Sequence, residues 1–389
     1  MPPRPSSTIP YAPKNRITPA ASVLVPMSRE EMEMLKDFRG EGTLRLAKRK
    51  RARSPELLED TGQPPEKKLA GDVGVIVDHY NSRPEVGVIQ RQDNPIIGLK
   101  NFNNWVKSVL ITRFVHPVLA ASSVKSVNGH GGGGRHRPAS GKVLDMGCGK
   151  GGDVTKWAKA RVKEYFAVDI AGVSVDQARQ RWQTLHPPRF DAQFAVLDCY
   201  SEPLTQAFHP TKLEQPFDAV SMQFCMHYAF ESIQKTRRML ENVSRYLRSG
   251  GVFIGTIPNA EQLLENLDAI EPDAEDLSFG NKVYKIRFES RESRPIFGHR
   301  YWFYLQDAVD NVPEYVVRWE NFVQLASEYR LSPVYRQEFH EVFREHQEHP
   351  EYSQLMQRMK VVDKDGASPM DEDQWEAANI YIAFAFQKQ

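Results

Sequence analysis

Three acidic residues and one glycine-rich turn carry the most specific chemistry in this sequence. Asp145 ends an apolar run and enters the turn 147–152 (GCGKGG), whereas Asp169 and Asp198 each follow a later apolar run. Glycines at such a turn let the backbone approach a ligand closely and let the next helix begin beside the sheet. Three acids around one pocket suit hydroxyl and amino donors and disfavour a diphosphate.

The glycine spacing is compatible with two ligands. Gly147, Gly149 and Gly152 satisfy G-x-G-x-x-G, and Asp169 lies twenty residues beyond Gly149, as in a dinucleotide site. S-adenosylmethionine needs a similar turn and an acid for its ribose hydroxyls, and its amino and sulfonium groups are positive. Because Asp145 would repel a pyrophosphate, we predict S-adenosylmethionine, with Asp198 at the adenine amine. A dinucleotide oxidoreductase and a merely solvated turn are the alternatives.

Short apolar strands and amphipathic helices alternate around these acids. The pattern predicts strands at Lys142–Met146, Tyr165–Asp169, Gln193–Leu197, Phe217–Met222 and Gly251–Ile257, and helices at Asp153–Ala160, Ser174–Leu185 and Glu231–Leu247. Such alternation predicts an α/β fold with a doubly wound, Rossmann-like, mostly parallel sheet. Ligands bind such sheets beyond the carboxyl ends of the strands.

The segments on either side of this alternation are expected to differ. Folded structure is expected to begin near Asp72, and residues 99–119 have helical spacing that should end at Pro117. Residues 122–140 predict a flexible insert, and residues 260–345 a small lobe over the ligand site. Further elements are expected as antiparallel strands at Phe279–Phe288 and Gly298–Leu305, a helix at Trp319–Tyr329, and a final antiparallel strand of the main sheet at Ile380–Gln387.

The first 70 residues have a different composition from the rest. They contain 14 Lys and Arg against 9 Asp and Glu, a net charge of +5 in a chain whose total is +1, and they are rich in proline. Such a segment cannot bury enough apolar surface to order itself, so a disordered basic tail is predicted. Its clusters 48–53 and 67–68 suit nuclear import or a phosphate tether. A solvated tail without a partner is the alternative.

Composition excludes several other classes of protein. The chain is 40% hydrophobic and 26% charged, which predicts a globular protein with a real core. No apolar run approaches the roughly 18–20 residues of a bilayer span, and the N-terminus has no secretory apolar region. Cys148, Cys199 and Cys225 are too scattered for disulfides or a zinc ribbon, so we expect packing cysteines, no metal and a reducing compartment.

Several motifs in and beyond the glycine turn resemble those of the eukaryotic mRNA cap guanine-N7 methyltransferases. The resemblance runs from about Asn94 to Lys388 with its motifs in matching order, and it identifies 94–389 as the expected methyltransferase domain. The motifs are Asn101–Lys107, Asp145–Asp153, Val168–Ala171, Phe217–Asp218, Gln223–Tyr228, Phe279–Asn281, Phe297–Gly298 with Tyr301, and Val312–Glu314.

The resemblance implies two sets of ligand contacts. Besides Asp145, which the acid pattern predicts, the cofactor contacts are Lys107, Gly147, Asp169, Asp198, Gln223 and Tyr228. The contacts to the cap and its triphosphate are Asn103, Asn104, Lys150, Lys156, Arg181, His227, Glu314 and Tyr381. By the local sequence alone, Glu314 follows Pro313 in a turn and would be solvated.

Methylation of guanine N7 requires no catalytic acid or base. N7 already carries an in-plane lone pair, so methyl transfer needs donor and acceptor held in line at roughly 3–3.5 Å. The expected substrate is 5′-capped nascent mRNA, acted on in the nucleus by a monomer whose tail contacts the transcription and capping machinery. A methyltransferase for another RNA or small molecule and a non-catalytic RNA-end binding protein are the alternatives.

Overall fold

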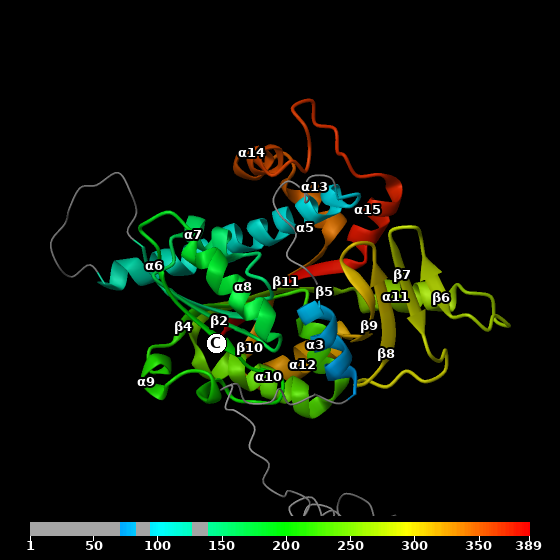
Figure 1. Cartoon of the computed structure of the whole chain (residues 1–389), viewed down its shortest axis with the longest axis horizontal. Helices are drawn as coiled ribbons and strands as arrows, with labels where there is room; N and C mark the ends of the chain where they lie inside the picture. The colour runs from blue at the N-terminus through cyan, green and yellow to red at the C-terminus, as the bar shows by residue number, and fades with distance from the viewer. Residues whose placement is uncertain (1–70, 83–93, 127–138) are drawn as a thin grey trace, which may run out of the picture. The chain divides into compact units, whose positions relative to one another are not determined.

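The computed structural model describes residues 71–82, 94–126 and 139–389, and Figure 1 shows their arrangement. The predicted disordered tail and residues 127–138 of the predicted insert lie outside the described residues. Residues 122–126 of that insert are the end of a helix instead of a loop. Two sheets form, one of seven strands in the order β10-β11-β5-β4-β1-β2-β3 and one of four in the order β6-β7-β8-β9.

The larger sheet confirms the predicted α/β fold. Its neighbours from β5 to β3 pair in parallel, whereas β11 pairs antiparallel with both β5 and β10. The strands are β1 (Lys142–Met146), β2 (Glu164–Asp169), β3 (Asp191–Val196), β4 (Phe217–Gln223), β5 (Leu247–Pro258), β10 (Leu331–Glu338) and β11 (Tyr381–Lys388). The edge strand β10 was not predicted.

Helices cover both faces of this sheet because its strands are apolar on both sides. Successive residues of β1 alternate between two core clusters, Val143 joining the first and Leu144 the second. The helices packed on the first cluster are α5 (Ile97–Leu110), α7 (Val154–Ala160), α8 (Gly172–Gln183), α11 (Ala260–Asp268), α13 (Phe339–His346), α14 (Pro350–Arg358) and α15 (Glu372–Asn379). Those on the second are α10 (Ile233–Tyr246) and α12 (Trp319–Ser327), with α9 (Pro210–Leu213) beside them.

Pro117 does not end the first helical segment as predicted. Helix α5 continues through a π-helical turn, Ile111–Val115, into α6 (His116–Ser126). The His116 N–H donates to the Ile111 carbonyl, five residues back. Pro117 is the second residue of α6, and the wider hydrogen-bonding register of the π-helical turn before it lets the helix continue past the proline. None of the described helices is long and apolar enough to cross a membrane.

The four-stranded sheet is larger than predicted and corrects the position of Glu314. It consists of β6 (Ser278–Gly280), β7 (Tyr284–Phe288), β8 (Arg300–Leu305) and β9 (Val309–Tyr315). Glu314 was expected in a solvated turn but lies in β9, opposite Tyr301 of β8. Pro313 is tolerated there because β9 is the edge strand.

Helix α3 (Asp72–Ser82) precedes the start expected for the methyltransferase domain and packs on α8 and β9. Both carboxylate oxygens of Asp72 accept from the Arg300 guanidinium at 3.0 Å, and the Tyr315 hydroxyl donates to one of them at 2.6 Å. This anchored helix therefore belongs to the same folded unit as the two sheets.

Asn242 of α10 fixes the loop that follows β3. Its side chain is buried, accepts from the Leu204 N–H at 3.1 Å, and donates to the Cys199 and Glu202 carbonyls at 2.9 Å each. Asn242→Ala should lower the free energy of unfolding by about 2–3 kcal/mol, because buried backbone groups lose their partners. Urea unfolding checks this, with Asn266→Ala on α11 as control. Equal stability of both variants would contradict the assignment.

Candidate active site

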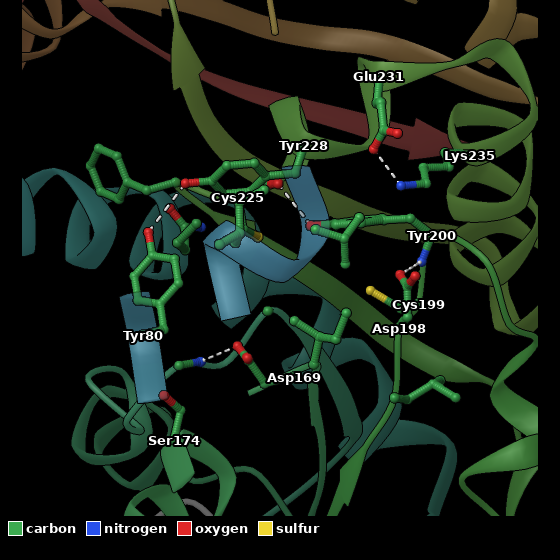
Figure 2. Close-up of a pocket in the computed structure, with 18 residues that line it drawn as sticks. Tyr80, Asp169, Ser174, Asp198, Cys199, Tyr200, Cys225, Tyr228, Glu231 and Lys235 are labelled. Carbon is green, nitrogen blue, oxygen red and sulfur yellow. Dashed lines mark hydrogen bonds and ion pairs between the residues drawn. The ribbon is translucent and has the colours of Figure 1, made fainter. Parts of the chain in front are cut away.

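A cavity of about 260 Å³ lies at the carboxyl ends of β1, β2, β3 and β4, and α3 forms one of its walls. Figure 2 shows its side chains. Predicted cofactor residues contribute to its lining, namely Gly147, Asp169, Asp198, Gln223 and Tyr228. The remaining lining residues are Val73, Ile76, Tyr80, Gly149, Ile170, Ser174, Leu197, Cys199, Tyr200, Phe224, Cys225, Glu231 and Lys235.

The turn after β1 needs glycine at two close approaches. Gly147 has a φ of +74°, and a Cβ there would lie 2.5 Å from the Cys225 Sγ. A Cβ at Gly151 would lie 2.8 Å from the Ala178 Cα of α8, whereas a Cβ at Gly152 would meet no described atom within 4 Å beyond its chain neighbours. The close helix contact therefore falls one residue before the last glycine of the dinucleotide spacing.

Asp169 organises the glycine turn from the end of β2. One carboxylate oxygen accepts from the Gly149 N–H at 2.8 Å (Figure 2), and the other accepts from the Ala171 N–H at 2.9 Å. Burial raises the pKa of this carboxyl, and these backbone donors act in the opposite direction. Each oxygen keeps acceptor capacity toward the cavity, which suits the vicinal hydroxyls of a ribose.

Asp198 and Gln223 offer further polar groups to the same cavity. The Asp198 carboxylate accepts from the Tyr200 N–H at 3.0 Å. The Gln223 amide donates to the Ser221 hydroxyl at 3.1 Å and accepts from Thr256 at 3.2 Å. With apolar walls from residues such as Ile170, Leu197 and Phe224, this set fits a nucleoside that carries amino groups.

Glu314 forms a buried cluster beside the cavity. Its side chain is 3% exposed and accepts from the Tyr301 hydroxyl at 2.8 Å and from the Tyr228 hydroxyl at 3.3 Å. His227 Nε2 lies 3.3 Å from a Glu314 oxygen, yet neither ring nitrogen of this 1% exposed histidine has a hydrogen-bond partner among the described residues. Tyr228 lines the cavity as well, so one side chain joins cavity and cluster.

A second buried ionic cluster links α5 to α7. The Asp153 carboxylate receives Lys107 Nζ at 2.9 Å and Lys156 Nζ at 2.7 Å, and Lys156 also donates to the Asn104 amide oxygen at 2.8 Å. Burial alone would raise the pKa of Asp153, but the two ammonium groups hold it well below its usual range. The amide oxygen of Asn103 nearby in α5 is buried, and no described residue forms a hydrogen bond with it.

Asp145 faces away from the cavity. Its carboxylate accepts from the Tyr165 hydroxyl at 2.7 Å and from the Trp157 indole at 3.3 Å, and it is absent from the cavity lining. Burial and then the charge of Asp153 raise the pKa of Asp145 to about 7. The structure therefore does not bring this residue to the other predicted cofactor residues.

The remaining predicted residues also stand outside the cavity lining. Lys150 lies in the turn before α7 and Arg181 in the last turn of α8, both half-buried. The Tyr381 ring at the start of β11 packs edge-on to Phe224 at 4.9 Å between centroids. Phe224 lines the cavity, so Tyr381 stands directly behind that wall.

Sequence reasoning missed the contribution of α3. Val73, Ile76 and Tyr80 line the cavity, and the Tyr80 hydroxyl lies 3.2 Å from that of Tyr228 (Figure 2). Burial raises the pKa of Tyr80 to about 12, so it stays a neutral phenol. The spacing of these residues, three and then four apart, is helical and was available as a signal.

The cavity contains two cysteines. Cys199 and Cys225 line the cavity as free thiols, and burial raises the pKa of both. Within residues 71–82, 94–126 and 139–389, no group of three His, Cys, Asp or Glu side chains is placed to hold a metal ion.

The strand order, with antiparallel β11 inserted between β5 and β10, and the acid-lined cavity define a class I S-adenosylmethionine-dependent methyltransferase fold. A family model described as the mRNA (guanine-N(7))-methyltransferase domain matches residues 65–389. The chain belongs to this family.

Relatives from fungi and plants agree with this assignment. An mRNA cap guanine-N(7) methyltransferase of Cryptococcus neoformans is 51% identical over 317 residues, which are 81% of this chain and 48% of that protein. The Schizosaccharomyces pombe enzyme of the same name is 43% identical over 81% of this chain and 82% of its own length. Arabidopsis thaliana mRNA cap guanine-N(7) methyltransferase 1 is 38% identical, covering 81% of each chain. The chain spans about half the length of the two Cryptococcus relatives.

The raised pKa of Asp145 predicts a pH-dependent stability. Between the ordinary aspartate pKa of 3.8 and a value of about 7, the folded state holds a proton that the unfolded chain releases. Stability from this carboxyl is therefore lost as pH rises through that window. Asp145→Asn accepts the same hydrogen bonds and has no proton to lose. From about pH 5 to about pH 8, it should gain roughly 1–3 kcal/mol relative to wild type.

Denaturant unfolding at several pH values measures this difference. Asp310→Asn, at an exposed position of β9, is the matched control and should follow the wild-type curve. Parallel stability curves for Asp145→Asn and wild type would contradict a protonated Asp145 in the folded state.

Proposed function

We propose that this protein transfers the methyl group of S-adenosylmethionine to guanine N7 of the 5′ cap of mRNA. The observation that carries the proposal is the position of Tyr228, which lines the cavity and also donates to the buried Glu314. A cofactor site and a carboxylate suited to guanine thus share one side chain. Family membership supports the same activity.

Each residue that would hold the cofactor would bind a different part of it. Asp169 would accept from the ribose hydroxyls, and Asp198 from the adenine amine. Gln223 and the backbone at Gly147 would meet the remainder, and Lys107 would reach it from α5. Asp145 would act indirectly, because its bonds to Tyr165 and Trp157 position the strand that leads into the turn.

Glu314 would read the guanine edge. A glutamate can accept from guanine N1–H and N2–H₂ together, a donor pair that no other base offers. The ring nitrogens of His227 and the amide oxygen of Asn103 have no hydrogen-bond partner in the described part of the chain, and they would be available to the same ligand. Asn104 and Tyr381 would complete the cap pocket, and Lys150, Lys156 and Arg181 would neutralise the triphosphate.

Catalysis would come from position and electrostatics. The cofactor supplies an electrophilic methyl group on a sulfonium, and guanine N7 attacks with a lone pair that needs no deprotonation. No side chain therefore acts as general base. The protein would hold the base against its aromatic and carboxylate neighbours, and Glu314 would stabilise the positive charge that N7 acquires.

The setting of this reaction follows from its substrate. Capped nascent mRNA places the protein in the nucleus, and the basic clusters 48–53 and 67–68 suit nuclear import and contact with the transcription and capping machinery. We propose that it acts as a monomer. A fluorescent fusion with and without residues 1–70 tests the role of the tail.

One experiment separates this function from its alternatives. Wild-type protein is given labelled S-adenosylmethionine and RNA ending in GpppG, and nuclease digestion then locates the methyl group. Label on cap guanine N7 supports the proposal. Label elsewhere indicates a methyltransferase for another RNA site, and binding of capped RNA without label indicates a non-catalytic RNA-end binding protein. Titration with NAD in place of S-adenosylmethionine tests the oxidoreductase.

Asp169→Ala should weaken binding of S-adenosylmethionine by about 1–3 kcal/mol, or roughly 5- to 150-fold, because ribose hydroxyls lose a charged acceptor. The loss of its bonds to Gly149 and Ala171 also loosens the turn. Isothermal titration measures the affinity, with Asp176→Ala on the exposed side of α8 as control. Unchanged affinity would remove Asp169 from the cofactor site.

Glu314→Gln should reduce kcat/KM on capped RNA by about 2–4 kcal/mol, or roughly 30- to 1000-fold, because a buried ionised acceptor becomes an amide with its own donors. Affinity for S-adenosylmethionine should stay near wild type. Inosine-capped RNA lacks the N2 amine, so the mutation should cost less there and the two losses should not add.

The exposed Glu348→Gln is the matched control and should keep wild-type kinetics. The assignment of Glu314 to the guanine pocket would be contradicted if Glu314→Gln lost affinity for the cofactor instead of the cap. It would also be contradicted if the losses in kcat/KM from the mutation and from the inosine cap were fully additive.

A further inference from the structure

A group of basic residues lies at the end of α7, beyond the proposed triphosphate site. Lys159 is in the last turn of α7, Arg161 caps that helix, and Lys163 immediately precedes β2. Arg189 precedes β3, whose first N–H donates to the Lys163 carbonyl. All four side chains are exposed. We call Lys159, Arg161, Lys163 and Arg189 the basic edge.

The charges of the basic edge are largely uncompensated. Lys159, Arg161 and Lys163 make no ion pair with any residue that the structure describes. Arg189 lies over the Trp182 ring, with its guanidinium carbon 5.4 Å from the ring centroid. Glu164 and Asp191, which pair at the starts of β2 and β3, are the acids adjacent to Lys163 in the sheet.

Arg161 has a backbone conformation that favours glycine, as do five other non-glycine residues that the structure describes. Its φ is +59° in the left-handed region, where a side chain costs roughly 1 kcal/mol. The Arg161 carbonyl accepts from the Ser140 N–H at 3.0 Å, so the backbone is tied to the fold while the side chain is exposed. The exposed guanidinium therefore adds a cation to the basic edge and takes no part in capping the helix.

The basic edge continues a line of cations that begins at the proposed cap site. Lys150 precedes α7 and Lys156 lies on it, and α7 packs beside α8, which carries Arg181 (Figure 1). Lys159 lies three residues after Lys156 on α7, about one helical turn further along. A helix of this length spans about 10 Å.

We infer that the basic edge binds the RNA body, the single-stranded transcript that follows the cap. The inference rests on the proposed function and extends it from the cap to the chain behind it. A stacked strand advances about 3.4 Å per nucleotide, so about three nucleotides reach from the start of α7 to its end. Phosphates then meet Lys159, Arg161 and Lys163 without regard to sequence, and a base can stack near Trp182 and Arg189.

The test compares two substrates in one triple variant, Lys159→Ala with Arg161→Gly and Lys163→Ala. The Arg161→Gly change relieves the left-handed backbone, so loss of fold is not expected. For a capped 20-nucleotide RNA, KM should rise about 10-fold, and the slope of log KM against log salt should fall by about 2, from three lost phosphate contacts. Both kcat and KM for the GpppG dinucleotide should stay at wild-type values.

The matched control removes three exposed cations elsewhere, Arg245→Ala with Lys282→Ala and Arg344→Ala. It should keep the wild-type preference for long RNA. An unchanged KM for long RNA in the basic-edge variant, or an equal loss in the control, would overturn the inference. Fluorescence anisotropy with an uncapped 20-nucleotide RNA measures binding at the basic edge without any methyl transfer. A wild-type protein that fails to methylate GpppG would therefore disprove the proposed function and leave this RNA-binding test intact.

Discussion

The buried carboxylate of Glu314 is the interaction on which the assembly of the site depends. It belongs to the four-stranded sheet, yet Tyr228 and His227, which come from the helical turn Met226–Glu231 after β4, approach it within 3.3 Å. Tyr80 extends the same cluster to α3 through Tyr228. A charge buried this deeply is stable only when such polar groups surround it. The two sheets and α3 are therefore held in one relative position by the group that the proposed substrate would use.

Asp145 and Asp153, two buried carboxylates near the glycine turn, have pKa values shifted in opposite directions. Asp153 stays ionised because Lys107 and Lys156 contact it directly. Burial and then the charge of Asp153 raise the pKa of Asp145, and its hydrogen bonds from Tyr165 and Trp157 offset this only in part. The charge of these two carboxylates is thus set by contacts among residues of α5, α7 and β1. Asp145 does not line the cavity, so its charge is not presented to a ligand there.

The sequence predicted the parallel strands well because each is a short apolar run between amphipathic helices. It could not tell which face of a strand a residue occupies where both faces are buried, and Asp145 in the wholly buried β1 is an example. Glu314 was misplaced because Pro313 indicates a turn, and only the pairing with β8 shows that β9 is an edge strand. Tyr80 was missed because its helix is short and gains its stability from tertiary packing.

The place of β11 in the larger sheet has a consequence for synthesis of the protein on the ribosome. Residues 381–388 form the bridge between β5 and β10, which otherwise share no backbone hydrogen bonds in the sheet. Translation therefore delivers every other strand of that sheet before the one that joins them, and such long-range pairing is slow. Until then β5 ends in an open edge, and an unpaired edge is a template for other chains. The newly made polypeptide thus depends on protection from aggregation up to its last strand.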